Sequence, residues 1–216
     1  MSPGLEGTGR VADEVYLLAH NDVTGKPYVQ PRPLGLGLAG VLLAELVLDG
    51  ALSVRDDELT VADGRRPPAD ELAHRVLGLV ASEREAHPVR DWLAYLGRTA
   101  PTQVADRLAA AGYLVETRRW FPWRPSRWVP VDRDSAFAPL LRVRTALDPA
   151  RPLTAECAVL AGLADACGLG YHLAEYAPAG GARSVDQVTA QLGPSLRDLI
   201  AQTRAAVDSA LLAHRI

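Results

Sequence analysis

The sequence of 216 residues contains few of the residue types that most often reveal a function. It has two cysteines and one methionine, Lys26 is its only lysine, and aromatic residues make up 6% of the chain. Cys157 and Cys167 form no C-x-x-C pair and have no histidine at zinc spacing, so we expect reduced, buried thiols. The five histidines form no ligand pair either. These residues predict neither a metal site nor a cofactor.

Motifs of catalysis are also missing from the sequence. There is no G-x-S-x-G element, no Walker loop, no carboxylate pair in a hydrolytic pattern and no cysteine with a local base. The net charge of −3 does not suit a general coat for nucleic acid, so any basic surface must be local. We therefore expect a protein that is not an enzyme, binds no cofactor and does not act on nucleic acid.

Long apolar runs and a leader pattern are absent too. The longest run, PLGLGLAGVLLAELVL, falls short of the roughly 20 residues that span a bilayer. The first residues also lack the pattern of a signal peptide, in which basic residues precede an apolar stretch. We expect a cytoplasmic chain that forms one domain over residues 1–216, with residues 1–9 disordered. A composition of 48% hydrophobic and 23% charged residues suits a globular fold.

Apolar periodicity predicts a mostly α, single compact helical domain with small β-hairpins, one of them protruding. Gly50 and Gly112 each follow a helix and precede a hairpin, so both are predicted to adopt the left-handed conformation that ends a helix. The expected helices cover residues 12–22, 34–48, 69–86, 88–97, 104–111, 137–147, 154–169, 185–192 and 196–215.

One segment matches a nucleotide-binding motif. Residues 35–40, GLGLAG, fit G-x-G-x-x-G, which in dinucleotide-binding proteins follows a buried strand. Here PYVQPRP precedes it, and its prolines cannot complete the hydrogen bonds of a central strand. We interpret the small residues as allowing a buried helix to pack closely against its neighbours.

The segment TRRWFPWRPSRW, residues 117–128, holds three of the four tryptophans and one of the two phenylalanines. Residues 117–133 carry five arginines and one aspartate, a local charge of +4 on a chain of −3. Tryptophan favours the boundary between hydrocarbon and water, and arginine can present its head to lipid phosphates while its stem is buried. The expected phosphate contacts are Arg118, Arg119, Arg124 and Arg127, and the expected anchors are Trp120, Phe121, Trp123 and Trp128.

Two other interpretations of this hairpin remain open. The rings can pack on a partner, in which case the hairpin joins a homo-oligomer or docks a protein client. The order helix, glycine, hairpin is also typical of a winged-helix DNA-binding module, with the arginines on its wing. Against the latter, residues 104–111 carry a single arginine, which is little charge for a recognition helix.

The order of segments resembles the Golgi phosphoprotein three family in a bacterial version. The resemblance rests on ADEVYLLAHNDVTGK, GLGLAGVLLAELVLDGALSV, DWLAYLGR and DRLAAAGYLVE, and runs over roughly residues 10–215. It implies a helical peripheral membrane protein without enzymatic activity. Eukaryotic members bind phosphatidylinositol 4-phosphate beside a protruding apolar hairpin and hold the cytosolic tails of Golgi glycosyltransferases.

The resemblance also implies contacts for the lipid headgroup. Of the four family positions, Arg98 keeps an arginine, whereas the other three fall on or near Gln30, Ala39 and Pro101. The expected partners are therefore an anionic phospholipid membrane, with the phosphoinositide pocket only partly kept, and protein client tails.

Overall fold

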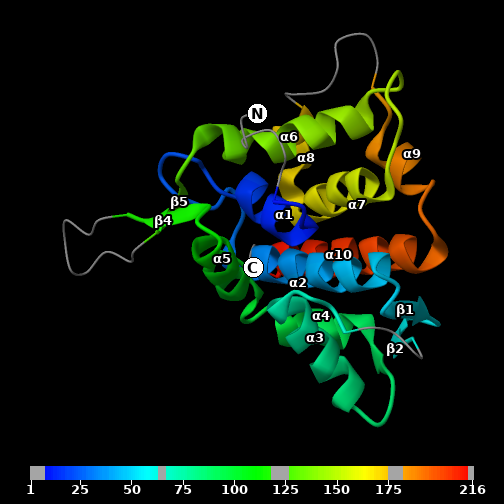
Figure 1. Cartoon of the computed structure of the whole chain (residues 1–216). Helices are drawn as coiled ribbons and strands as arrows, with labels where there is room; N and C mark the ends of the chain where they lie inside the picture. Colours follow the sequence, from blue (N-terminus) through cyan, green and yellow to red (C-terminus); the bar gives the residue numbers. More distant parts are fainter. Residues whose placement is uncertain (1–7, 63–66, 118–126, 175–181, 214–216) are drawn as a thin grey trace.

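The computed structural model describes residues 8–62, 67–117, 127–174 and 182–213. The elements follow one another along the chain as α1 (Val11–Ala19), α2 (Pro31–Leu48), β1 (Leu52–Arg55), β2 (Glu58–Val61), α3 (Glu71–Ser82), β3 (His87–Pro88), α4 (Val89–Leu96), α5 (Ala100–Ala110), β4 (Leu114–Glu116), β5 (Trp128–Pro130), α6 (Arg133–Leu147), α7 (Ala155–Ala164), the π-helix η2 (Asp165–Leu169), α8 (Gly170–Ala174), α9 (Val185–Thr189) and α10 (Pro194–Leu212). The predicted class, mostly α with small hairpins, is confirmed (Figure 1).

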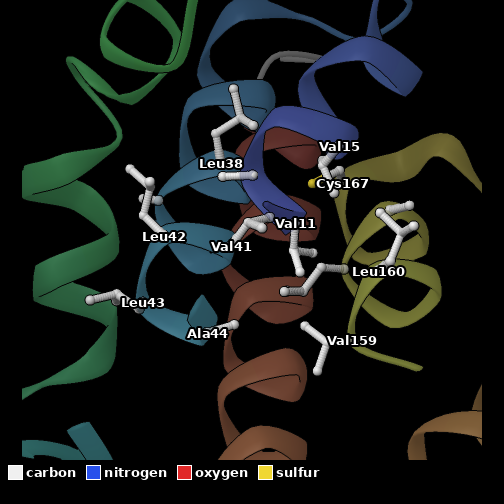
Figure 2. Close-up of a cluster of buried hydrophobic side chains, with 14 of the residues drawn as sticks. Val11, Val15, Leu38, Val41, Leu42, Leu43, Ala44, Val159, Leu160 and Cys167 are labelled. Carbon is white, nitrogen blue, oxygen red and sulfur yellow. The ribbon is translucent and has the colours of Figure 1, made fainter. Parts of the chain in front are cut away.

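Helix α2 lies at the centre of the fold. It starts at Pro31, where a missing N–H costs no hydrogen bond, and every residue from Pro33 to Leu46 is buried. It packs against α10, α1, α4, α5 and α7. Figure 2 shows its side chains Leu38 and Val41 facing those of neighbouring helices. The prediction of a buried helix is confirmed, and α2 begins three residues earlier than expected.

The small residues of α2 allow neighbouring elements to approach its backbone. A Cβ atom at Gly35 would overlap the carbonyl oxygen of Gly97, and one at Gly37 would overlap the sulfur of Cys167. A Cβ atom at Gly40 would overlap the side chain of Thr203 on α10. The G-x-G-x-x-G match is therefore a packing feature inside a helix and not the loop of a nucleotide site, as interpreted from the sequence.

Both predicted helix–glycine–hairpin units are present. Gly50 and Gly112 have φ angles of 61° and 81°, the left-handed conformation expected of them. In the first unit β1 and β2 pair antiparallel around Asp56 and Asp57, whose positive φ angles fit a tight hairpin turn. This turn also contacts α10, because Gln202 Nε2 donates to Asp57 Oδ1 at 3.0 Å.

The sequence prediction is wrong at some boundaries. The helix expected over 69–86 ends at Ser82, because the chain must extend before His87 pairs with Leu59 in the unpredicted strand β3. The helix expected over 154–169 changes at Asp165 into η2, where Gly168 has a φ of 87°. A glycine with positive φ interrupts regular α-helical hydrogen bonding there.

Two helical stretches are long and apolar enough to cross a membrane by length and composition alone, Pro31–Leu48 and Ala155–Ala174. Of these windows, 72% and 61% respectively are buried inside the protein. The first is the central helix α2, and the second contains the irregular turn at Gly168. Protein side chains therefore cover most of both stretches, as in core helices.

Candidate membrane-binding surface

The stem of the predicted protruding hairpin is formed by β4 and β5 at the edge of the molecule (Figure 1). Leu114 pairs with Pro130 and Glu116 with Trp128, and the Thr117 N–H donates to the Arg127 carbonyl at 2.7 Å. Six of the predicted contact residues lie outside the described residues: Arg118, Arg119, Trp120, Phe121, Trp123 and Arg124.

The other two predicted hairpin residues, Arg127 and Trp128, lie in this stem. Both are half-buried, and Trp128 packs against the hydrophobic core. Gly25, with a φ of 62°, sits so close that a Cβ there would overlap the Trp128 carbonyl oxygen. Trp128 is thus held at the base of the hairpin, and its ring is not fully exposed as a pure membrane anchor would be.

The loop between α1 and α2 braces this base. Asn21 orders the loop, since its Oδ1 accepts from the Thr24 N–H at 2.8 Å and its carbonyl accepts from the Gly25 N–H at 2.9 Å. His20 and Pro27 form an isolated antiparallel bridge across it. Because Gly25 then touches the backbone of Trp128, the hairpin stem and the loop form one surface.

Many of the exposed large apolar side chains lie on the hairpin stem or on segments linked to it. Six of the ten large apolar side chains that are exposed among the described residues belong to the stem and the residue after it, the bracing loop, α6 or α8. We call this set the hairpin-base surface: Val23, Tyr28, Val115, Val131, Phe137 and Tyr171. Apolar side chains that are exposed together, in contrast to scattered ones, mark sites of interaction with proteins or membranes.

Contacts between the segments support their treatment as one region. Tyr28 and His172 pack with ring centroids 4.4 Å apart, which joins the loop to α8. Phe137 from α6 lines the same cavity of about 290 Å³ as these two rings. The Asp132 carboxylate accepts from the N–H groups of Asp134 and Ser135, which starts α6 directly after the hairpin and holds the pKa of Asp132 below its usual value.

Arg98 lies in a different turn, between α4 and α5. It is exposed, and its guanidinium lies 5.3 Å from the centre of the Tyr95 ring. The contact of Gly97 with Gly35 brings this turn to the start of α2, which directly follows the bracing loop. The bracing loop therefore lies between Arg98 and the hairpin stem.

The other headgroup positions implied by the resemblance offer no cation. Gln30 is exposed before the first turn of α2, Pro101 is half-buried in the first turn of α5, and Ala39 is fully buried in α2. Recognition of a phosphate by chelation needs several donors aimed at one point. Among these four positions Arg98 alone has a charged donor.

Sequence reasoning missed a buried ionic cluster. Asp13 lies in the first turn of α1, and its Oδ1 accepts from Arg107 Nε at 2.8 Å. Arg107 also donates to Asp70 Oδ2 at 2.9 Å and lies 3.5 Å from Glu45. The neighbouring Glu14 is fully buried and pairs with Arg142. The available signal was the presence of acids between the apolar residues of a buried helix.

Burial controls the electrostatics of this cluster. It raises the pKa values of Asp13, Glu14 and Glu45, and Arg107 and Arg142 oppose these shifts. Burial alone would lower the pKa of Arg107, but the carboxylates of Glu45, Asp13 and Asp70 outweigh this and raise it, so Arg107 stays charged. Within the part of the chain that the structure describes, no group of histidine, cysteine or acidic residues could hold a metal ion. The cluster ties α1, α2 and α5 together and is not a metal centre.

The fold defines a mostly helical domain with a hairpin stem that the loop between α1 and α2 braces. The chain belongs to the family described as Golgi phosphoprotein 3 (GPP34), which it matches over residues 11–203. This is a family of lipid-binding adaptors associated with the Golgi membrane and not of enzymes. No curated protein matches the chain.

Proposed function

We propose that this protein is a peripheral membrane-binding adaptor that docks on anionic lipid through its hairpin and the hairpin-base surface. Arg118, Arg119, Arg124 and Arg127 contact lipid phosphates, Trp120, Phe121 and Trp123 anchor the hairpin at the interface, and Arg98 adds a minor contact. Trp128, predicted from the sequence as a fourth anchor, supports the base of the hairpin instead. The observation that carries this proposal is the gathering of exposed apolar side chains around the stem that presents the arginine- and tryptophan-rich segment.

The energies involved favour the use of both charge and apolar contact. A charge of +4 over residues 117–133 gives roughly 4 kcal/mol near an anionic surface, which alone corresponds to about millimolar binding. A few half-buried rings at ~1 to 2 kcal/mol each bring the total to a useful reversible affinity. Exposed Val23 and Val131 extend the apolar contact beyond the hairpin.

The headgroup specificity follows from the residues around Arg98. With Gln30, Ala39 and Pro101 at the other positions, a doubly charged phosphate meets one guanidinium only. We therefore expect binding that depends on the negative charge of the membrane and shows little preference for phosphatidylinositol 4-phosphate.

Cosedimentation with vesicles tests the proposal. Wild-type protein is compared with Trp120→Ala/Trp123→Ala and Arg124→Ala/Arg127→Ala on neutral vesicles, on anionic vesicles, and on anionic vesicles that contain phosphatidylinositol 4-phosphate. The matched control is Arg75→Ala/Arg90→Ala, which removes two exposed arginines from α3 and α4.

The expected result is salt-sensitive binding of wild type and control to anionic vesicles, with at least a ten-fold loss in both hairpin variants. Equal loss in the control would mean that only total charge matters. Absence of binding to every vesicle would refute the proposal.

The hairpin also favours a second candidate function, self-association. In the described residues β4 and β5 form a two-stranded sheet, so each strand has one edge without a neighbouring strand, and Val115 on β4 is 49% exposed. Such edges are templates for pairing with a second copy. Sedimentation velocity over a hundred-fold range of concentration tests this: dimerisation that Val115→Lys abolishes supports it, and a monomer at all concentrations rejects it.

A further inference from the structure

The outer face of α10 has no role in the proposed function. Exposed residues recur along it every three or four positions, which places them on one side of the helix: Pro194, Arg197, Ala201, Ala205, Asp208 and Leu212. We call this set the α10 face. Together with Thr189 at the end of α9, the middle of the face lines a groove of about 460 Å³. The part of the groove on α10 runs from Arg197 to Asp208.

The α10 part of the groove has opposite charges at its two ends. Arg197 and Asp208 are eleven residues apart, which is about three helical turns, so they lie on the same side of the helix, roughly 16 Å apart along its axis. Both residues are exposed. Among the described residues neither side chain belongs to an ion pair, so both charges remain available to another molecule.

Negative charge exceeds positive charge at the Asp208 end. The Arg204 guanidinium lies 2.6 Å from the carboxylate of Asp165 and 3.7 Å from that of Asp186. Burial raises the pKa of Asp165 and Arg204 opposes this shift, while Asp186 and Asp208 raise the pKa further. Three carboxylates therefore act around one guanidinium, so this end of the groove attracts a further cation.

Small side chains separate the two charged ends. Ala201 and Ala205 are exposed and line the groove, so the backbone of another helix can come close there. Leu212 at the end of α10 is 63% exposed, and Pro194 at its start is exposed too. A small ion would balance one end of the groove and be repelled by the other. The order apolar, positive, small, negative, apolar is complementary to itself when one copy is reversed, so the face fits a second copy of this chain.

We propose that the α10 face is the interface of a homodimer in which the two α10 helices pack antiparallel. A two-fold axis at the level of residues 202 and 203 sets Arg197 opposite Asp208 of the partner subunit, and by symmetry Asp208 opposite the partner's Arg197. The incoming arginine supplies the cation that the acidic end attracts. Ala201 then faces Arg204 of the partner subunit, so a small side chain lies opposite a long one. The interface does not include the hairpin, so it does not depend on the proposed function.

Sedimentation velocity of the full chain over a hundred-fold range of concentration tests the dimer. Arg197→Glu and Asp208→Arg each break both symmetric ion pairs and put like charges opposite each other, so each is expected to weaken dimerisation about ten-fold. The combined variant Arg197→Glu/Asp208→Arg exchanges the two charges, and its dimerisation is expected to return to within about three-fold of wild type. The matched controls Arg90→Glu and Asp91→Arg reverse exposed charges on α4 and are expected to leave dimerisation unchanged.

A dimer that both single reversals weaken and the combined variant restores supports the antiparallel arrangement. A monomer at every concentration overturns the proposal, and so does a dimer that the single reversals leave unchanged. A dimer that Val115→Lys abolishes while the α10 variants retain it belongs to the hairpin and also overturns the proposal. A combined variant that stays as weak as the single variants overturns the pairing of Arg197 with Asp208. Both α10 positions are exposed, so the variants are expected to fold, and circular dichroism checks this.

Discussion

Replacement of Arg107 by methionine is expected to destabilise the fold strongly. The Arg107 side chain is 11% exposed and contacts three carboxylates, those of Asp13, Asp70 and Glu45, whose side chains are 5%, 11% and 9% exposed. After the substitution, Arg10, 3.6 Å from Asp70, is the cation that remains beside these carboxylates among the described residues. Loss of one partner from a buried ion pair typically costs about 3 to 5 kcal/mol, a large part of a free energy of unfolding of about 5 to 15 kcal/mol.

The deficit in Arg107→Met must depend on pH. Burial raises the native pKa values of Asp13 and Glu45 above their unfolded values, which are close to 4. The native state therefore binds protons more tightly than the unfolded state, and stability falls as pH rises from the unfolded through the folded pKa. Without Arg107 these pKa values rise further, so the deficit is larger at pH 8 than at pH 5.

Urea unfolding followed by far-ultraviolet circular dichroism at both pH values measures this deficit. The control is Arg75→Met, since Arg75 is 54% exposed and pairs with Glu71 on the surface of α3, where a loss of less than about 0.5 kcal/mol is expected. A deficit for Arg107→Met below about 1 kcal/mol at pH 8, or one that does not shrink at pH 5, would refute this account of the cluster.

Three further outcomes follow from packing and burial. Gly37→Ala places a Cβ against the Cys167 sulfur and should lower the free energy of unfolding by about 1 to 3 kcal/mol, as measured by urea unfolding. Its control, Gly78→Ala, adds a methyl group in open space on an exposed helix and should raise stability by about 0.5 to 1 kcal/mol; the opposite order would contradict the packing argument. Burial raises the pKa of Cys167 to about 12, so a thiol reagent should modify half-buried Cys157 in the native protein and Cys167 only on unfolding; equal rates would show that the interior opens readily.

The sequence predicted the elements whose local signals agree with their environment. Residues 34–48, apolar apart from Glu45, match the buried helix α2, and Gly50 and Gly112 match the two left-handed caps. In both cases the signal is local, because a buried helix needs apolar residues on all sides and a left-handed residue favours glycine.

Features that depend on distant partners were not predictable in this way. The pairing of Arg107 with Asp13 joins residues 94 positions apart, and no local pattern indicates it. Strand β3 has two residues and exists because His87 meets Leu59 across the small sheet. The meeting of Tyr28, Phe137 and His172 around one cavity likewise follows from the packing of helices and not from their order in the chain.

The candidate site likewise has a part that the sequence predicted and a part that it did not. The order of segments indicated a hairpin after Gly112, and its stem is present as β4 and β5. The contacts of its arginines and aromatic rings stay predictions. The apolar contribution of the bracing loop was not expected, since Val23 and Tyr28 are isolated in the sequence. Because Trp128 is half-buried and packs on the core, it supports the base of the hairpin and does not act as a membrane anchor.

The most direct test of membrane docking is hydrogen exchange of the full chain with and without anionic vesicles. The account predicts slower exchange over residues 112–131, which include the hairpin, and over the bracing loop 21–28, with no change in α3. Protection confined to other elements, or binding without any protection of the hairpin, would contradict the claim that this hairpin and its base contact the membrane.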